Sequence, residues 1–225
     1  MSVFGRLRAM ADPRDARSLS NRFRAKRFAR FEATVADLPT PIRVLDVGGE
    51  ADYWIQRGVH DDSKYEITII NVAENGAAPP FLEFRLGDAT RLPFEDQSFD
   101  VVHSNSCIEH VGELSDELRA ASEIRRVAAR YFVQTPGRAT PFEPHFQFPF
   151  FGLLPFDVRV WLVRRFGLGH GDRKDAEANV REVRLMNKRE IRRAFPDATI
   201  WTERVLGLPK SYVVTGRGTA SGTTR

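Results

Sequence analysis

The segment from Val44 to Glu50 reads Val-Leu-Asp-Val-Gly-Gly-Glu and combines residue types that can hold a small ligand. It starts as an apolar run typical of a buried strand. Gly48 and Gly49 then permit a tight turn and a close approach of a ligand to the backbone. Many nucleotide-binding proteins share such a turn. The two glycines therefore predict either a ligand site at the end of a strand or a tight turn without a ligand.

Asp46, which lies just before these glycines, narrows the choice of ligand. A carboxylate beside a pyrophosphate would be repulsive in a crevice of low dielectric constant. The same carboxylate would attract a ligand that carries a cationic amino group and a sulfonium. The turn therefore favours S-adenosylmethionine over NAD, and replacing Asp46 by alanine is expected to lower cofactor affinity while leaving the fold largely intact.

Further polar residues follow the third and fourth apolar runs of the chain. Asp88 could accept a hydrogen bond from an exocyclic adenine amine, or it could only cap a helix. Glu109 and His110 follow the fourth run and either take part in a site or cap and orient the next helix. His103, which ends an apolar run, is typical of a histidine buried in a core.

Short apolar runs alternate with helical stretches after Pro41. The runs are Ile42–Val47, Glu66–Val72, Phe81–Leu86, Phe99–Asn105 and Arg130–Thr135. Most of them are nearly continuous Val, Ile, Leu and Phe, as expected of strands covered on both faces. An amphipathic stretch, Ser115–Ala128, lies between the last two runs. This alternation predicts an α/β fold with a parallel, doubly wound sheet.

The ends of the chain add further elements. A helix at Lys188–Phe195 precedes two expected strands near Thr199–Arg204 and Ser211–Thr215. Residues 1–17 are predicted to be a flexible basic arm and residues 216–225 a disordered tail. Residues 18–215 are predicted to form a single domain.

A helix is expected from Ser18 to Leu38, with apolar residues on one face and basic residues on the other. The apolar residues are Phe23, Phe28, Phe31 and Val35. The basic residues are Arg22, Arg24, Lys26, Arg27 and Arg30. The basic face is either solvated or in contact with a phosphate or an acidic substrate, and Arg24 or Arg27 could hold an anionic part of that substrate.

The overall composition excludes several classes of protein. The chain has 225 residues, 42% hydrophobic and 28% charged, with a net charge of +4, so nucleic acid is not an expected partner. Cys107 is the single cysteine, which rules out an internal disulfide and a zinc site built from several cysteines; no metal is expected. The sequence shows no signal peptide and no apolar run of membrane-spanning length, so a cytoplasmic location is expected.

The segment 140–175 interrupts the alternation and is predicted to be an insertion or lid. Its aromatic residues are Phe142, Phe146, Phe148, Phe150, Phe151, Phe156, Trp161 and Phe166. Prolines break up its first half, and Phe156–Phe166 could form a helix. The segment would either form a satellite core or enclose a substrate. Trp161 and Phe166 beside arginines also suggest contact with a membrane surface.

A candidate general base lies at the start of this insertion, in the sequence Pro141-Phe142-Glu143-Pro144-His145-Phe146. Histidine suits the task because its unperturbed pKa is ~6.5. Glu143 could polarise or orient His145. The alternative is that His145 only attaches the lid to the domain.

The stretches LDVGG and GDATRLPFEDQSFDVVHSNSCIEHV together resemble the class I S-adenosylmethionine-dependent methyltransferases of the methyltransferase type 11 kind. The resemblance is good over residues 42–137 and weaker through residue 215. It implies a Rossmann-like sheet of seven strands, the last antiparallel, with the insertion after the fifth strand. It also implies a methyltransferase whose cofactor is S-adenosylmethionine.

The resemblance implies roles for a set of cofactor-binding residues. Those expected at the methionine end are Asp46, Gly48 and Gly49. Those expected beside the adenine are Asp88 and Ala89, and those expected near the transferred methyl are Ser104 and Asn105.

The sequence departs from this family pattern at two places. Glu50 and Asp52 stand where glycines are usual in the first loop. Asn71, followed by Val72, stands at the end of the second strand, where an acidic residue usually binds the ribose hydroxyls. An amide can still bind a hydroxyl, but without charge assistance the bond is weaker. Glu74 lies nearby as a substitute.

The acceptor is expected to be a small molecule, such as one linked to a lipid or a saccharide, because the aromatic lid suits flat or amphipathic molecules. Two alternatives remain on the sequence alone. One is a methyltransferase-like binding module without activity. The other is an NAD-dependent or nucleotide-sugar Rossmann enzyme. Peripheral membrane contact is compatible with methyl transfer to a lipid-linked acceptor.

Overall fold

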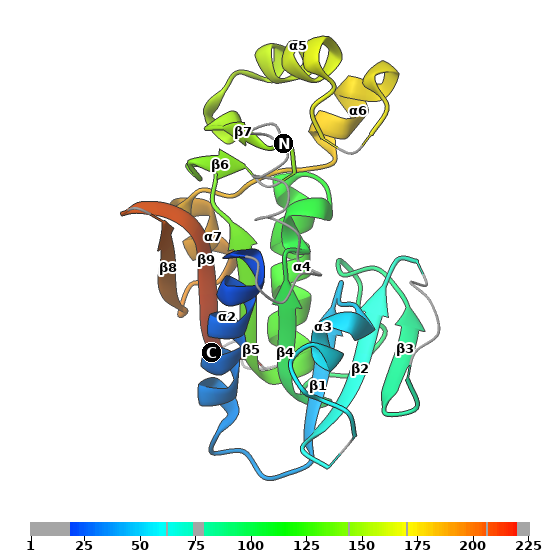
Figure 1. The fold of residues 1–225 in the computed structure, drawn as a ribbon. Coiled ribbons are helices and arrows are strands. Elements are labelled where there is room, and N and C mark those ends of the chain that lie inside the picture. Colours follow the sequence, from blue (N-terminus) through cyan, green and yellow to red (C-terminus); the bar gives the residue numbers. More distant parts are fainter. Residues whose placement is uncertain are drawn as a thin grey trace, which may run out of the picture.

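A single seven-stranded sheet forms the centre of the protein (Figure 1). The computed structural model describes residues 19–61, 63–73, 79–143, 145–169, 171–205 and 207–219. The strand order is β3-β2-β1-β4-β5-β9-β8. The strands are β1 (Ile42–Val47), β2 (Tyr65–Asn71), β3 (Leu82–Leu86), β4 (Phe99–Asn105), β5 (Ala128–Pro136), β8 (Thr199–Val205) and β9 (Leu208–Arg217).

All strands except β9 run in the same direction. β1 pairs in parallel with both β2 and β4, β2 with β3, and β4 with β5. β9 lies antiparallel to both β5 and β8. This confirms the predicted doubly wound sheet with an antiparallel last strand. Because the chain order reverses between β1 and β4, a crevice at their carboxyl ends is the expected place for a ligand.

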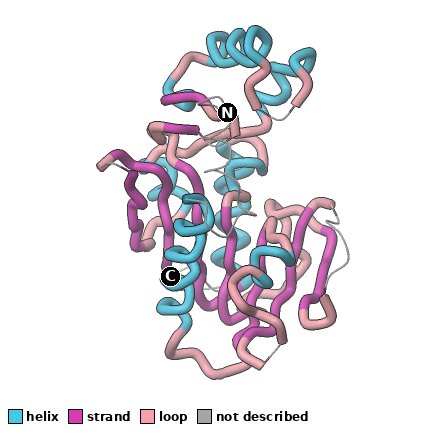
Figure 2. Tube along the Cα trace, in the orientation of Figure 1, coloured by secondary structure: helices cyan, strands magenta, loops and turns pink. Residues whose placement is uncertain are grey.

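Helices cover both faces of the sheet (Figures 1 and 2). On one face lie α2 (Leu19–Val35) and α3 (Ala51–Ile55), whose buried Phe31 and Trp54 pack in one aromatic core. On the other face lie α4 (Leu114–Val127) and α7 (Lys188–Ala194), which pack through residues such as Ile124. The sequence analysis did not predict α3 because five residues are too few to show a helical period.

The insertion after β5 stands over the carboxyl ends of β4 and β5 (Figure 1). It contains the short hairpin β6 (Phe142–Glu143) and β7 (Phe148–Pro149), followed by α5 (Phe156–Phe166) and α6 (Ala176–Arg181). Its own core includes Phe146, Phe151 and Val163, and Phe146 stacks on Phe151 at 4.2 Å between ring centroids. The expected satellite core is therefore present, and α5 has the predicted bounds.

The carboxyl-terminal strand is longer than predicted. β9 continues through Arg217, and the amides of Gly218 and Thr219 donate to Ala129 O and Arg125 O. Part of the predicted tail is therefore held against β5 and the end of α4. The predicted basic arm at residues 1–17 and residues 220–225 lie outside the described residues. No described helix is long and apolar enough to cross a membrane.

Candidate functional site

The loop after β1 is a tight turn that only glycine fits. Gly48 has φ +72°, and its amide donates to Ile70 O at 2.8 Å. A Cβ on Gly48 would lie 2.3 Å from the Cys107 Sγ, and a Cβ on Gly49 would lie 1.9 Å from an oxygen of Asp46. Side chains are therefore excluded at both positions. The side chains of Cys107 and Asp46 pack directly against this turn.

The carboxylate of Asp46 is turned into the protein. Asp46 is 1% exposed. One of its oxygens accepts from Trp54 Nε1 at 2.8 Å, and the other lies 2.7 Å from His103 Nδ1. Because both oxygens are already bonded, Asp46 would act on a ligand at this turn through its charge and not through a direct hydrogen bond. His103 is the core histidine that the sequence predicts, stacked on Phe132.

Asn71 connects the end of β2 to the glycine loop. Its Nδ2 donates to Gly49 O at 3.3 Å, and its Oδ1 accepts from the Val72 amide at 2.8 Å. The side chain thus lies beside the predicted crevice, where it supports the loop. Val72 itself is 78% exposed. Glu74, the predicted substitute for a ribose ligand, lies outside the described residues.

Asp88 follows β3 and is exposed to solvent. One carboxylate oxygen accepts from the Thr90 amide at 2.8 Å. Within the described part of the chain, the other oxygen has no hydrogen-bond partner, so it is available to a ligand. Ala89 is partly buried and packs against the main core.

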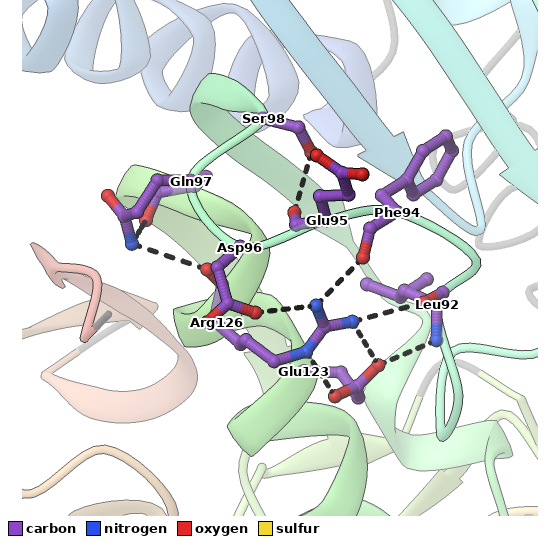
Figure 3. A network of polar contacts seen from close by, with 9 residues as sticks. Leu92, Phe94, Glu95, Asp96, Gln97, Ser98, Glu123 and Arg126 are labelled. Carbon is purple, nitrogen blue, oxygen red and sulfur yellow. Dashed lines mark hydrogen bonds and ion pairs between the residues drawn. The ribbon is translucent and has the colours of Figure 1, made fainter. Parts of the chain in front are cut away.

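The loop that follows Asp88 is fixed to α4 by Arg126 (Figure 3). The guanidinium donates to Leu92 O, Phe94 O and the Asp96 carboxylate at 2.7–3.1 Å. It also forms two 2.7 Å bonds to Glu123, which in turn accepts from the Leu92 amide. This network holds in place residues 92–96, which follow Asp88.

The residues at the end of β4 are bonded to the protein itself. Ser104 Oγ donates to Val47 O at 3.0 Å, and Asn105 Oδ1 accepts from Arg27 at 3.0 Å. Arg27 also donates to Gln134 and pairs with Glu203 at 3.2 Å, and it is 7% exposed. The hypothesis that Arg27 binds an anionic acceptor is therefore corrected, because its guanidinium is used inside the fold.

Acidic residues surround the Cys107 side chain behind the glycine turn. Burial raises the pKa of the Cys107 thiol to about 12, and the charges of Glu109, Asp46 and Asp88 act on it in the same direction. These carboxyl groups come from β1, from the loop after β3 and from the segment after β4, and they gather around one point behind Gly48. The ionised groups among them attract a cationic ligand and repel a pyrophosphate.

Glu143 and His145 form the pair that the sequence predicts. His145 Nδ1 lies 2.5 Å from one oxygen of Glu143, and the other oxygen accepts from the Phe146 amide at 2.6 Å. Glu143 is 1% exposed, whereas the His145 side chain is 24% exposed. A buried carboxylate thus fixes the orientation of a partly accessible imidazole through its Nδ1.

Two more titratable residues complete the cluster. His110 Nε2 lies 3.1 Å from His145 Nε2. Glu109 is fully buried; one of its oxygens accepts from Thr135, and the other has no hydrogen-bond partner in the described structure. Ligand atoms of Glu109, His110 and His145 lie within 4.8 Å of one another, so these described residues could also hold a metal ion.

The electrostatics separate the two histidines. Burial lowers the pKa of His110, and the nearby His145 lowers it further. Burial alone would lower the pKa of His145, but the hydrogen bond and charge of Glu143, with Glu109 and Glu182, raise it above its ordinary value. Burial also raises the pKa of Glu109 to about 7. His145 is therefore the stronger base of the pair.

The sequence could not show that His110 joins this cluster. Glu109 and His110 stand out as a pair, but the contact with His145 spans 35 positions and depends on how the insertion folds back. Thr135, at the end of β5, carries no signal of its own. By contrast, Glu143 and His145 are only two positions apart, which is why their contact was predictable.

Comparisons with known proteins agree with this fold. Residues 59–130 match the sequence model of a family described as methyltransferase domain. No curated protein matches the sequence. A structure of an S-adenosylmethionine-dependent methyltransferase from Methanosarcina mazei is 14% identical, with a TM-score of 0.53 over 82% of this chain and 95% of that chain.

Two further structures are similar at the same level. A Pyrococcus horikoshii protein is 18% identical, with a TM-score of 0.53 over 97% of this chain and 100% of that one. Phosphoethanolamine N-methyltransferase 2 of Haemonchus contortus, in complex with S-adenosylmethionine, is 16% identical, with a TM-score of 0.54 over 79% of this chain but only 38% of that one. Identities this low show a shared fold.

The sheet order and these likenesses define the class I methyltransferase fold. The family match adds sequence evidence for a methyltransferase domain over residues 59–130, which is about a third of the chain.

Proposed function

We propose that this protein transfers the methyl group of S-adenosylmethionine to a small-molecule acceptor held between the β1–β4 crevice and the insertion. The observation that carries the proposal is that Asp46, the two-glycine turn and Asp88 lie together at the carboxyl ends of β1 and β3, on a sheet with the class I methyltransferase strand order. Carboxylates placed there complement the sulfonium and the ammonium of this cofactor.

The cofactor would be held by residues from successive strand ends. Gly48 and Gly49 would let the methionine end approach the backbone, above the buried charge of Asp46. Asn71 and Val72 would face the ribose. Asp88 would accept from the adenine amine through its free oxygen, beside Ala89. Ser104 and Asn105 would border the methyl group from the end of β4.

The protein's own contribution to chemistry is positioning and proton removal. When bound, S-adenosylmethionine supplies an electrophilic methyl group for in-line displacement, a reaction that gains most from fixed geometry. His145 acts as the general base that takes the proton from an acceptor hydroxyl or ammonium. Glu143 holds the imidazole with Nδ1 toward its carboxylate, at 2.5 Å. His110 lies against Nε2 and can share the proton.

The acceptor is a small molecule with an apolar portion, such as a lipid-linked or saccharide-linked compound. The insertion that covers the site offers aromatic and aliphatic walls, including Phe146, Phe151 and Leu154. Sites of this kind bind flat or amphipathic molecules.

Calorimetric titration tests the proposal. We expect S-adenosylmethionine and its demethylated product to bind, and Asp88→Ala to weaken both by about tenfold, which is about 1.4 kcal/mol and the size of one charge-assisted hydrogen bond. Glu95→Ala is the matched control, because Glu95 is an exposed acid further along the same loop. Unchanged affinity in Asp88→Ala would refute the adenine assignment.

The same titration separates the alternatives. A folded protein that fails to bind S-adenosylmethionine at millimolar concentration would support a methyltransferase-like binding module. Tighter binding of NAD than of S-adenosylmethionine would support the NAD-dependent enzyme. A screen of cell extract with labelled methyl donor then identifies the acceptor.

A peripheral membrane contact is supported by the outer face of α5. Val158, Trp161 and Phe166 are 40%, 57% and 53% exposed, and Arg164 and Arg165 are exposed beside them. This combination suits an anionic lipid surface. We expect sedimentation with phosphatidylglycerol vesicles and a several-fold loss in Trp161→Ser. Leu208→Ser, which removes an exposed apolar residue of β9, is expected to sediment like the parent. Equal sedimentation of all three proteins would contradict the contact.

A further inference from the structure

A cavity of about 620 Å³ lies between the insertion and the segment that leads into α4. Four arginines line it: Arg138, Arg159, Arg181 and Arg184. Its other walls are largely apolar, and Glu143, the partner of the proposed base, forms part of the lining. The cavity therefore joins a cluster of cations to the place where the chemistry is proposed to occur.

Two of the four arginines are neutralised by carboxylates. Arg184 pairs with Glu117 and Glu190, both of which are mostly buried. Arg181 pairs with Glu177 at 3.1 Å on the surface. The acids of the lining itself have other roles: Glu143 is bonded to His145 and the Phe146 amide, and Glu113 is the N-cap residue of α4.

Arg159 is the cation without a counter-ion. None of the ion pairs among the described residues includes it, and its Nε is buried without a hydrogen-bond partner. Its guanidinium lies 5.7 Å from the ring centre of Phe156, and the guanidinium of Arg181 lies 4.7 Å from the same ring centre. Ring contacts of this kind compensate a cation only in part.

Arg138 adds a second, weakly paired cation. Its guanidinium lies 3.9 Å from Glu190, at the limit of an ion pair, and its Nε donates to Leu185 O. Burial lowers the pKa of Arg159, and repulsion from Arg138 lowers it further. Two guanidinium groups thus repel each other in a partly buried place, and an unpaired buried donor is costly. An anion between them would relieve both costs.

We propose that this cavity is the anion subsite of the acceptor site, in which Arg159 and Arg138 bind a carboxylate or phosphate group on an apolar acceptor. The assignment of the subsite to the acceptor rests on the proposed methyl transfer. Arginine suits this role because its planar fork matches the oxygens of either acid. Phe151, Leu154 and Phe156 would contact the apolar part. Held in this way, the acceptor is directed toward Glu143 and His145.

Simple aromatic probes test the subsite without knowledge of the acceptor. Benzoate and phenyl phosphate each carry an acid on an apolar ring, and benzamide is the neutral counterpart of benzoate. We expect calorimetry to show binding of the two acids, weakened by added salt, and at least tenfold weaker binding of benzamide. Whichever acid binds more tightly identifies the group that the subsite prefers. Equal affinity for benzamide and benzoate would overturn the proposal.

A matched pair of variants on α5 assigns the binding to one residue. Arg159→Gln is expected to weaken binding of both acids at least tenfold. Arg164→Gln removes an exposed arginine outside the cavity and is expected to bind like the parent. Circular dichroism confirms folding. If Arg159→Gln does not fold, Arg138→Gln takes its place, with a smaller expected loss of affinity for the acids. Parent-like acid binding in the folded arginine variants of the cavity would refute the assignment.

Titration of S-adenosylmethionine on the same samples separates this inference from the proposed function. Acid binding without cofactor binding would keep the anion subsite and overturn the methyl transfer. Cofactor binding without acid binding would keep the proposed methyl transfer and overturn the anion subsite.

Discussion

Replacing His145 by glutamine is expected to lower the turnover number by about 100-fold to 10,000-fold, the range typical of losing a general base. Glutamine keeps the approximate shape and polarity of the side chain but cannot accept the proton. The affinity for S-adenosylmethionine should stay within twofold, because His145 lies in the insertion and not at the β1–β4 crevice. Turnover is measured with labelled methyl donor and the acceptor found by the extract screen.

His60→Gln is the matched control for this substitution, because His60 is exposed on the loop after α3. It should turn over at the parent rate. If His145→Gln also does so, His145 is not the base and only attaches the insertion to the domain.

The pH profile gives a second readout of the same role. A general base works in its neutral form, and Glu143 with Glu109 and Glu182 raises the pKa of His145 above 6.5 despite its burial. The rate should therefore be low at acidic pH and rise through a midpoint above 6.5. His110, which faces His145 directly, has a pKa shifted in the opposite direction, because burial and the charge of His145 lower it.

Glu143→Gln should move this midpoint to lower pH, because it removes the charge that stabilises the imidazolium. Direct titration of the His145 ring by NMR measures the same shift without an acceptor. A role for Glu143 in packing alone would leave the midpoint in place. Assays in the presence of a chelator exclude a metal ion bound by Glu109, His110 and His145 as the cause of any change.

The sheet was predictable from sequence because buried parallel strands are continuous apolar runs. Ile42–Val47 and Phe99–Asn105 agree with β1 and β4 at both ends. The resemblance added the antiparallel last strand. The short helix α3 was not predictable, since Trp54 fixes it by burial and not by a repeating pattern.

The sequence predicted where the candidate residues lie along the strands, but it did not predict which way their side chains point. Asp46 lies where the sequence places it, yet Trp54 and His103 turn its carboxylate inward, and His103 is 57 positions away. Arg27 donates a hydrogen bond to Glu203, which is 176 positions away in the sequence. Its guanidinium is therefore buried in the fold and does not lie on the basic surface that the helix pattern predicted. Contacts of this length depend on how the sheet assembles. The cation cluster around Arg159 was missed for the same reason.

Asp46 offers the most informative substitution, because its structural and electrostatic roles can be separated. Asp46→Ala leaves the buried Trp54 Nε1 and the His103 ring without a partner and opens a gap beneath Gly49. We expect it to lower the free energy of unfolding by about 3–5 kcal/mol, as for other broken buried pairs. This corrects the expectation from the sequence that the substitution leaves the fold largely intact. Chemical denaturation measures the loss.

Asp46→Asn keeps the packing and removes the charge. Its carbonyl oxygen can still accept from Trp54 Nε1, and its amide can donate to His103 Nδ1 in the tautomer that carries the proton on Nε2. Stability should fall by less than half as much as in Asp46→Ala, while affinity for S-adenosylmethionine should fall by about tenfold because the crevice loses one charge.

Asp100→Ala is the control for the loss of a carboxylate from the sheet. Asp100 lies near the amino end of β4, away from the glycine turn. Its ion pair with Arg43 is partly exposed, so the expected loss of stability is below about 1 kcal/mol, with cofactor affinity unchanged. A stable Asp46→Ala would show that the inward hydrogen bonds contribute little. Parent-like cofactor binding in Asp46→Asn would show that this carboxylate supports the glycine turn alone, and the attraction for the sulfonium would then have to come from Asp88.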